Sequence, residues 1–169
     1  KKKRDILHDD HFKKMIKLDK DKVLLGSYAS YEWMNDPKHL LFKMSRYKFV
    51  SKMLNGKKNV LEIGAGDGFA SKIVSEVVKN LDLCDVTESS KEQYEMFNVE
   101  KNKYFIHNFT KKKTLKKYDC IYSLDVIEHI EKKIFDRFIK NIKNSLKNNG
   151  TLIIGQPSLS SQKYASKYS

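Results

Sequence analysis

Cysteine and proline are scarce in this chain, and long apolar runs are absent. The 169 residues include two cysteines and two prolines, and two cysteines are too few for a disulfide-stapled scaffold. Cys84 and Cys120 both lie in apolar, strand-like stretches, so we expect buried thiols in a reducing, cytoplasmic environment. No apolar stretch approaches the length of a membrane span or opens the chain as a signal peptide. We therefore expect no membrane partner.

Arginine is also rare, which changes the meaning of the net charge of +13. Arg4, Arg46 and Arg137 are the only arginines among 34 basic residues, and the lysine-rich remainder is typical of an AT-rich genome. Forked contacts to phosphates and bases favour arginine. We therefore interpret the lysine runs at 1–3 and 111–113 as solvated surface, and the composition disfavours nucleic acid as a partner.

Strand-like and helix-like patterns alternate along most of the chain. Residues 1–35 are polar and basic, with an aromatic cluster at Tyr28, Tyr31 and Trp33 that is either a lid or packing for this segment. From residue 36 to 169 we expect one domain, with a helix from Asp36-Pro37 to about 54 and then alternating elements. The expected strands are 60–63, 81–86, 103–107, 118–124 and 151–155, and the expected helices are 69–79, 89–97 and 127–147. This alternation predicts an α/β fold, a doubly wound and mostly parallel sheet with an N-terminal helical segment.

A glycine-rich turn follows the first strand. Residues 60–69 have the sequence VLEIGAGDGF, with glycine at 64, 66 and 68. Each glycine removes a Cβ, so the backbone can turn sharply and a ligand can lie against it. The spacing G-x-G-x-G differs from the G-x-G-x-x-G of dinucleotide enzymes, which disfavours an NAD-dependent oxidoreductase. A turn that only links strand to helix remains an alternative.

This turn, with Glu62 inside the preceding strand, resembles motif I of the class I S-adenosylmethionine (SAM)-dependent methyltransferases. The resemblance implies a Rossmann-like fold and SAM as cofactor, with nearby acids facing its cationic groups. That fold usually has seven strands. Five are placed here. The last two, an antiparallel pair, either lie beyond Ser169, as we expect, or are absent from this protein. The motif residues expected to contact SAM are Glu62, Gly64, Ala65, Gly66, Asp67 and Gly68.

Further matches to the family extend the expected cofactor site. Asp85 ends the second strand and is expected to accept hydrogen bonds from the ribose hydroxyls, whereas Asp82 lies inside the strand. The segments 118–130 and 146–154 resemble the family's fourth strand and its approach to the fifth, so the resemblance covers roughly residues 40–158. It implies that SAM also contacts Val86 beside the ribose, Asn108 and Phe109 at the adenine, the Leu124 carbonyl at the ammonium, and Arg46 at the carboxylate.

Asp125, Glu128 and His129 follow the fourth strand at i, i+3 and i+4, which places them on one face if a helix begins by Asp125. Two carboxylates and an imidazole can hold a divalent metal. A similar acid-x-x-Glu-His group binds a metal in ubiquinone-pathway O-methyltransferases and small-RNA 3′-terminal 2′-O-methyltransferases. Asp125 stands where those enzymes usually have Glu, and no histidine follows His129. The alternative is that Glu128 and His129 only line the cleft or cap the helix.

The predicted function is SAM-dependent methylation of a hydroxyl group on a small molecule. His129 is the expected proton acceptor, with Glu128 beside it, either directly or through a metal. An RNA 2′-O-methyltransferase and a non-catalytic SAM-binding or scaffold subunit are the alternatives. Nothing in the sequence indicates the acceptor or the oligomeric state.

Overall fold

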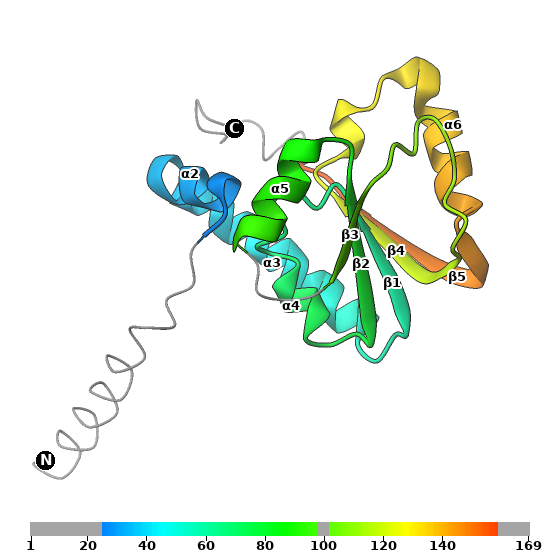
Figure 1. The fold of residues 1–169 in the computed structure, drawn as a ribbon, viewed down its shortest axis with the longest axis horizontal. Coiled ribbons are helices and arrows are strands. Elements are labelled where there is room, and N and C mark those ends of the chain that lie inside the picture. The colour runs from blue at the N-terminus through cyan, green and yellow to red at the C-terminus, as the bar shows by residue number, and fades with distance from the viewer. Residues whose placement is uncertain (1–24, 98–101, 159–169) are drawn as a thin grey trace, which may run out of the picture.

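The computed structural model describes residues 25–97 and 102–158, which form a parallel five-stranded sheet with helices on both faces (Figure 1). The strand order is β3-β2-β1-β4-β5, and each adjacent pair is parallel. The doubly wound α/β fold predicted from the alternating pattern is therefore confirmed. The strands are β1 Asn59–Ile63, β2 Asn80–Asp85, β3 Lys103–Ile106, β4 Tyr118–Leu124 and β5 Leu146–Gly155. The helices are α2 Ser27–Asn35, α3 Pro37–Leu54, α4 Lys72–Ser75, α5 Glu88–Phe97, the 3-10 turn η2 Ile127–His129 and α6 Lys132–Lys143.

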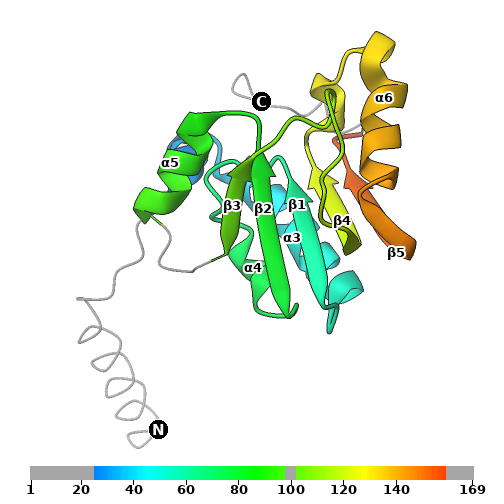
Figure 2. The ribbon, with the colours of Figure 1, turned by 45° about the vertical axis from the view of Figure 1, so that its right-hand side comes forward.

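Two apolar cores lie on opposite faces of the sheet. Alternate strand residues point to opposite faces, so β2 contributes Leu83 to one core and its neighbour Cys84 to the other. The first core is completed by α3, α4 and α5, and the second by α6. Figures 1 and 2 show α3 and α4 on one side of the sheet and α6 on the other. The central strand β1 is buried on both faces, which fixes the position of the turn that follows it.

Helix α3 forms where the sequence predicted it. The Asp36 carboxylate accepts a hydrogen bond from the His39 backbone N–H at 3.1 Å, and Pro37 occupies the first helical turn, where its missing N–H costs nothing. Its buried stripe packs against β4 and α4. This stripe consists of Leu40, Tyr47, Val50, Ser51 and Leu54.

The helix predicted at 69–79 is wrong in length. Only the four residues of α4 are α-helical, and turns surround them. Two backbone bonds explain the early end: Gly56 N–H donates to the Val77 carbonyl at 2.8 Å, and Lys79 N–H donates to the Lys57 carbonyl at 2.8 Å. These tertiary bonds draw the chain into β2 before a third helical turn can form.

The long helix predicted at 127–147 is also wrong. Asp125 has a φ of +54°, a left-handed conformation that no helix start allows. A single 3-10 turn follows, and the extended Ile130 and Glu131 delay α6 until Lys132. At the other end, β5 already begins at Leu146, and its register with β4 shifts between Tyr118 and Cys120. Asn148, Asn149 and Gly150, which directly follow the predicted helix, therefore lie within β5.

The described part of the expected N-terminal segment, residues 25–35, contains helix α2. Helix α2 packs on α3, and the side chain of Ala29 is buried. Residues 1–24 lie outside the described residues, so most of the predicted basic segment is not addressed. The antiparallel strand pair expected beyond Ser169 stays an expectation. Within the described ranges, no helix combines the length and apolar character that crossing a membrane requires.

Candidate functional site

A cavity of about 640 Å³ opens at the carboxyl ends of the parallel strands. This is the edge where ligands collect in such sheets. The loops after β1, β2, β3 and β4 supply one side, and α2 and α3 supply the other. Its lining consists of Tyr28, Glu32, His39, Lys43, Tyr47, Ile63, Gly64, Ala65, Gly66, Asp67, Asp85, Val86, Thr87, Ser90, His107, Asn108, Phe109, Thr110, Leu124, Asp125, Val126, His129, Ile130 and Phe138.

The first glycine of the turn is required by the protein itself. Gly64 has a φ of +79°, and a Cβ there would lie 2.2 Å from Cγ2 of Val126, in the loop after β4. Gly66 differs, because its Cβ position meets only the Tyr28 ring, at an ordinary 3.6 Å. Gly68 does not line the cavity, and its Cβ would strike the Tyr94 ring at 2.4 Å. Among these three glycines, only Gly66 has a Cβ position that the protein itself leaves open, and its role in making room for a ligand stays a prediction.

Asp85 holds the glycine turn from the end of β2. Its carboxylate accepts the Gly66 N–H at 3.0 Å and the Val86 N–H at 2.7 Å, and it lines the cavity. Asp82 lies elsewhere: it is buried, and it accepts hydrogen bonds from the Tyr118 hydroxyl at 2.8 Å and Lys116 at 2.7 Å. Choosing Asp85 as the cavity acid agrees with this placement, and Asp82 lies inside the strand, away from the cavity lining.

The loop after β3 forms an aromatic and amide part of the lining. Phe109 is buried, and the His107 ring packs edge-on against it with 4.5 Å between ring centres. Burial lowers the pKa of His107, whose Nε2 contacts the Lys112 carbonyl at 2.9 Å. The Asn108 side-chain oxygen accepts bonds from the backbone N–H and the hydroxyl of Thr110, at 2.8 and 2.6 Å. Both lone pairs of that oxygen are thus used, and the amide N–H donors remain.

Glu62 lies behind the cavity rather than in it. Its carboxylate is buried and accepts hydrogen bonds from the Tyr47 and Tyr122 hydroxyls, each at 2.5 Å. Burial raises the pKa of Glu62, and these hydroxyl donors oppose that rise. Tyr47 does line the cavity. Glu62 therefore fixes the Tyr47 ring in the wall, and the structure does not place it against a ligand.

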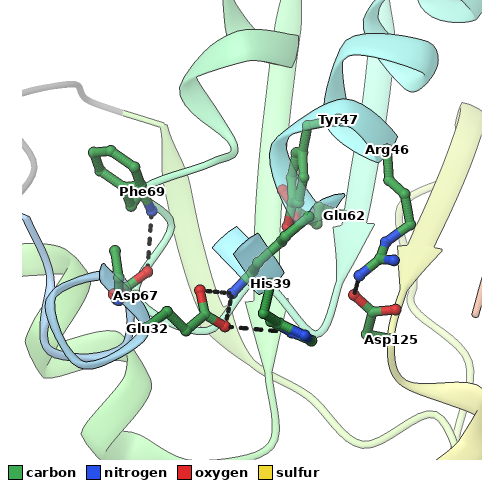
Figure 3. A network of polar contacts seen from close by, with 10 residues as sticks. Glu32, His39, Arg46, Tyr47, Glu62, Asp67, Phe69 and Asp125 are labelled. Atoms are coloured by element: carbon green, nitrogen blue, oxygen red, sulfur yellow. Dashed lines mark hydrogen bonds and ion pairs between the residues drawn. The ribbon is translucent and has the colours of Figure 1, made fainter. Parts of the chain in front are cut away.

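Asp67 joins the glycine turn to α2. Its carboxylate accepts the Ala29 N–H at 3.1 Å, in the first turn of α2, and the Phe69 N–H at 3.2 Å (Figure 3). The contact is close, because a Cβ on Gly26 would lie 2.3 Å from an Asp67 oxygen. Asp67 thus supplies the capping acceptor that the helix lacks at its own N-cap. This bond places Tyr28 and Glu32 in the cavity wall.

Asp125 pairs with Arg46 and does not join a metal site. The two side chains meet at 2.5 Å (Figure 3), and Arg46 itself does not line the cavity. The left-handed Asp125 backbone removes the helical spacing that was expected to align three ligands. His129 lines the cavity, whereas Glu128 is exposed outside the lining. Among the described residues, no group of three His, Cys, Asp or Glu side chains is placed to hold a metal, so the metal group predicted from Asp125, Glu128 and His129 is not assembled.

Helices α2 and α3 contribute a polar wall that the sequence analysis missed. Glu32 of α2 accepts hydrogen bonds from Lys43 at 3.2 and 3.3 Å, and His39 lies 3.8 Å from the same carboxylate (Figure 3). His39, Lys43 and Tyr47 are spaced i, i+4 and i+8 on α3, so they form one row that meets the buried stripe at Tyr47. A search for polar residues at this spacing would have found them.

The structure gathers most of the predicted cofactor residues. Nine of the twelve line the cavity: Gly64, Ala65, Gly66, Asp67, Asp85, Val86, Asn108, Phe109 and Leu124. The other three are Arg46 and Glu62, which contact the lining residues Asp125 and Tyr47, and Gly68, which lies against Tyr94 outside the lining. Of the predicted catalytic pair, His129 lines the cavity and Glu128 does not.

Solved structures with the same fold include methyltransferases. The DhpI complex with SAH has a TM-score of 0.64 at 12% identity, over 75% of this chain and 62% of that chain. The N-methyltransferase NodS from Bradyrhizobium japonicum WM9, in complex with S-adenosyl-L-homocysteine (SAH), has a TM-score of 0.60 at 19% identity, over 75% and 70%. The sugar N-methyltransferase KedS8 from Streptoalloteichus sp ATCC 53650 has a TM-score of 0.61 at 13% identity, over 79% and 55%.

At these identities the likeness shows the fold alone, and this chain spans less than two thirds of the DhpI and KedS8 chains. No curated protein sequence matches the chain. A family model described as a methyltransferase domain, however, matches residues 30–168. Since that match covers most of the chain and includes every element around the cavity except the start of α2, the protein belongs to the methyltransferase-domain family, and the resemblance of its glycine turn to class I SAM-dependent methyltransferases is confirmed.

Proposed function

We propose that the cavity binds SAM and that the protein transfers a methyl group to a hydroxyl of a small molecule. The observation that carries the proposal is that the Gly66 turn, Asp85 and the His129 imidazole all line one cavity of about 640 Å³. That volume lies within the range of about 300–1,000 Å³ that is usual for small-molecule and cofactor sites.

The residues present fit SAM at its ribose and adenine ends. An ionised carboxylate has about four lone-pair sites, so Asp85 can still accept from ribose hydroxyls after bonding the Gly66 and Val86 N–H groups. The Asn108 oxygen is already occupied by Thr110. We therefore expect Asn108 to donate to an adenine ring nitrogen instead of accepting from the adenine amino group, with Phe109 beside it.

SAM supplies an electrophilic methyl group bonded to a sulfonium. The protein's part is then to orient the acceptor, exclude water and remove the hydroxyl proton. His129 and His39 both line the cavity, and a neutral imidazole can accept that proton. Glu128 is left out of this role, because it lies outside the lining. Leu124 ends β4 at the cavity, where its carbonyl is proposed to receive the SAM ammonium.

The charge of the lining argues against RNA as the acceptor. Although the chain carries a net charge of +13, its cavity is lined by four carboxylates and one lysine. The negatively charged phosphodiester backbone of an RNA would be repelled by this excess of carboxylates over lysines. The carboxylates are Glu32, Asp67, Asp85 and Asp125, and the lysine is Lys43. Amine acceptors, as the names of NodS and KedS8 indicate for those proteins, are an outcome that a methyl-transfer screen separates from hydroxyl acceptors.

The test is binding of SAM and SAH to Asp85→Ala, measured by calorimetry. Loss of the ribose hydrogen bonds should weaken both ligands alike by about 2–4 kcal/mol. Asp136→Asn, an exposed acid on α6, is the matched control and should change nothing. A larger loss of SAM affinity in Asp82→Ala would show that the wrong acid was chosen.

Methyl transfer by the wild type should continue in the presence of a chelator. Inhibition by the chelator that a divalent metal reverses would instead support the metal hypothesis. SAM binding without transfer to any hydroxyl or amine would support the scaffold alternative.

A further inference from the structure

The cavity has two sides of different composition. The strand loops supply the glycine turn, Asp85 and Asn108, which the proposed function assigns to SAM. The opposite side comes from α2 and α3, and it carries Tyr28, Glu32, His39, Lys43 and Tyr47. The proposed function assigns only a proton-accepting role there, to His39. This second side is therefore a part of the lining that the proposed function leaves open for the acceptor.

Glu32 is held at the centre of this second side. Both of its carboxylate oxygens accept from Lys43, at 3.2 and 3.3 Å, and His39 approaches one of them at 3.8 Å. The Glu32 and Lys43 side chains are only 19% and 26% exposed, so water screens this ion pair less than a surface pair. A smaller recess of about 140 Å³ adjoins the cavity and shares Tyr28, Glu32 and His39 with it.

The fixed charges on this side cancel in pairs. On α2 and α3, Lys43 neutralises Glu32, and Asp125, in the loop after β4, is paired with Arg46 of α3. A charged acceptor bound on the α2 and α3 side would lose hydration, and the opposite charge nearest to it is already engaged in the Glu32–Lys43 ion pair. An uncharged acceptor avoids that cost. The aromatic part of the wall also favours an uncharged acceptor. The Tyr47 hydroxyl donates to Glu62, so only the apolar ring of Tyr47 remains for an acceptor.

We propose that Glu32, His39 and Lys43 form the acceptor-recognition subsite, and that it selects an uncharged hydroxyl compound with an apolar body. This inference rests on the proposed function and names its substrate class. The ammonium of Lys43 has three N–H donors, and the Glu32 carboxylate has about four acceptor sites. The pair can thus donate to and accept from the hydroxyls of the acceptor without breaking, while the Tyr28 and Tyr47 rings contact its apolar body.

Three phenols of similar size test the charge selection. They are 4-hydroxybenzyl alcohol, which is neutral, tyramine, which is cationic, and 4-hydroxyphenylacetate, which is anionic. Binding of each to the full chain saturated with SAH is measured by calorimetry, so that no turnover is needed. The wild type should bind the neutral phenol at least about tenfold more tightly than either charged one.

Breaking the pair from each side should move the preference in opposite directions. Lys43→Met leaves Glu32 unpaired, so the ratio of tyramine to neutral affinity should rise about tenfold. Glu32→Gln leaves Lys43 unpaired, so the corresponding ratio for 4-hydroxyphenylacetate should rise by a similar factor. The double variant Glu32→Gln/Lys43→Met has no charge at either position and should recover the wild-type preference. Lys48→Met, on the exposed face of α3, is the matched control and should leave all ratios unchanged.

Failure of the inference can be told apart from failure of the proposed function. If the wild type does not bind SAH, the proposed function is wrong. If SAH binds but neither single variant changes the preference, or both change it in the same direction, the subsite is wrong. If SAH binds and none of the three phenols does, the proposed acceptor class is wrong. SAH affinity in each variant should equal that of the wild type, which also shows that the variant is folded.

Discussion

The contact between Gly64 and Val126 allows the steric and backbone demands of the glycine turn to be separated. Replacing Gly64 by Ala keeps a φ of +79° that L-residues disfavour and places a Cβ 2.2 Å from Cγ2 of Val126. The left-handed conformation costs about 1–2 kcal/mol, and forcing an extra methyl into a packed contact costs about 1–3 kcal/mol. We therefore expect Gly64→Ala to lower the free energy of unfolding by about 2–5 kcal/mol.

Gly56 supplies the matched control. Its φ of +75° is nearly the same, but no atom lies within 4 Å of its Cβ position. Gly56→Ala should therefore lose only the backbone part, about 1–2 kcal/mol. Adding Val126→Ala to Gly64→Ala removes the clash, so the double variant should be more stable than the sum of the two single losses by about 1–3 kcal/mol.

Urea unfolding followed by circular dichroism measures all four variants. Equal losses in Gly64→Ala and Gly56→Ala, or strict additivity with Val126→Ala, would refute the clash as the reason for glycine at 64. In that case the turn would need glycine for its backbone alone. If Gly64→Ala is as stable as the wild type but binds SAH more weakly, Gly64 would instead have the ligand-facing role expected from the motif.

Two further predictions concern the supports of the cavity. Asp67→Ala should release α2, since the helix loses its capping acceptor. The fluorescence anisotropy of Trp33, the single tryptophan, should then fall. An unchanged anisotropy would show that Asp67 does not cap the helix. Burial lowers the pKa of His107 in the folded protein. At pH values between the folded and the unfolded pKa, the imidazole therefore binds a proton more readily in the unfolded chain. The free energy of unfolding should then decrease as the pH falls below about 6.5. His107→Gln should flatten the pH dependence of the melting temperature between pH 5 and about 7, and an unaltered slope would disprove this assignment.

The sequence predicted the sheet well, because its signals are local and repeated. The bounds of β4 were predicted to the residue, and those of β1, β2 and β3 within one residue at each end. Short apolar runs between polar turns are sufficient for this when both faces of a strand are buried. Helix α3 was found equally well, since its capping acid and proline lie side by side in the chain.

The errors lie where contacts distant in sequence override local pattern. The apolar spacing after the glycine turn favoured a long helix, but the bonds from Gly56 and Lys79 end it early. The metal hypothesis required a helix that begins by Asp125, but this residue is left-handed and pairs with Arg46, 79 positions away. The acceptor side of the cavity was missed for the same reason, because Glu32 becomes part of the wall only when Asp67 holds α2 in place.

The two thiols lie on different faces of the sheet and are buried within separate cores. Cys84 belongs to the core beneath α6, and Cys120 belongs to the core beneath α3 and α4. A thiol reagent can reach either one only after the covering layer has opened. Labelling rates at the two positions therefore report the opening of the two layers independently. Equal rates would mean that the molecule opens as one unit, and unequal rates would identify which layer separates from the sheet first.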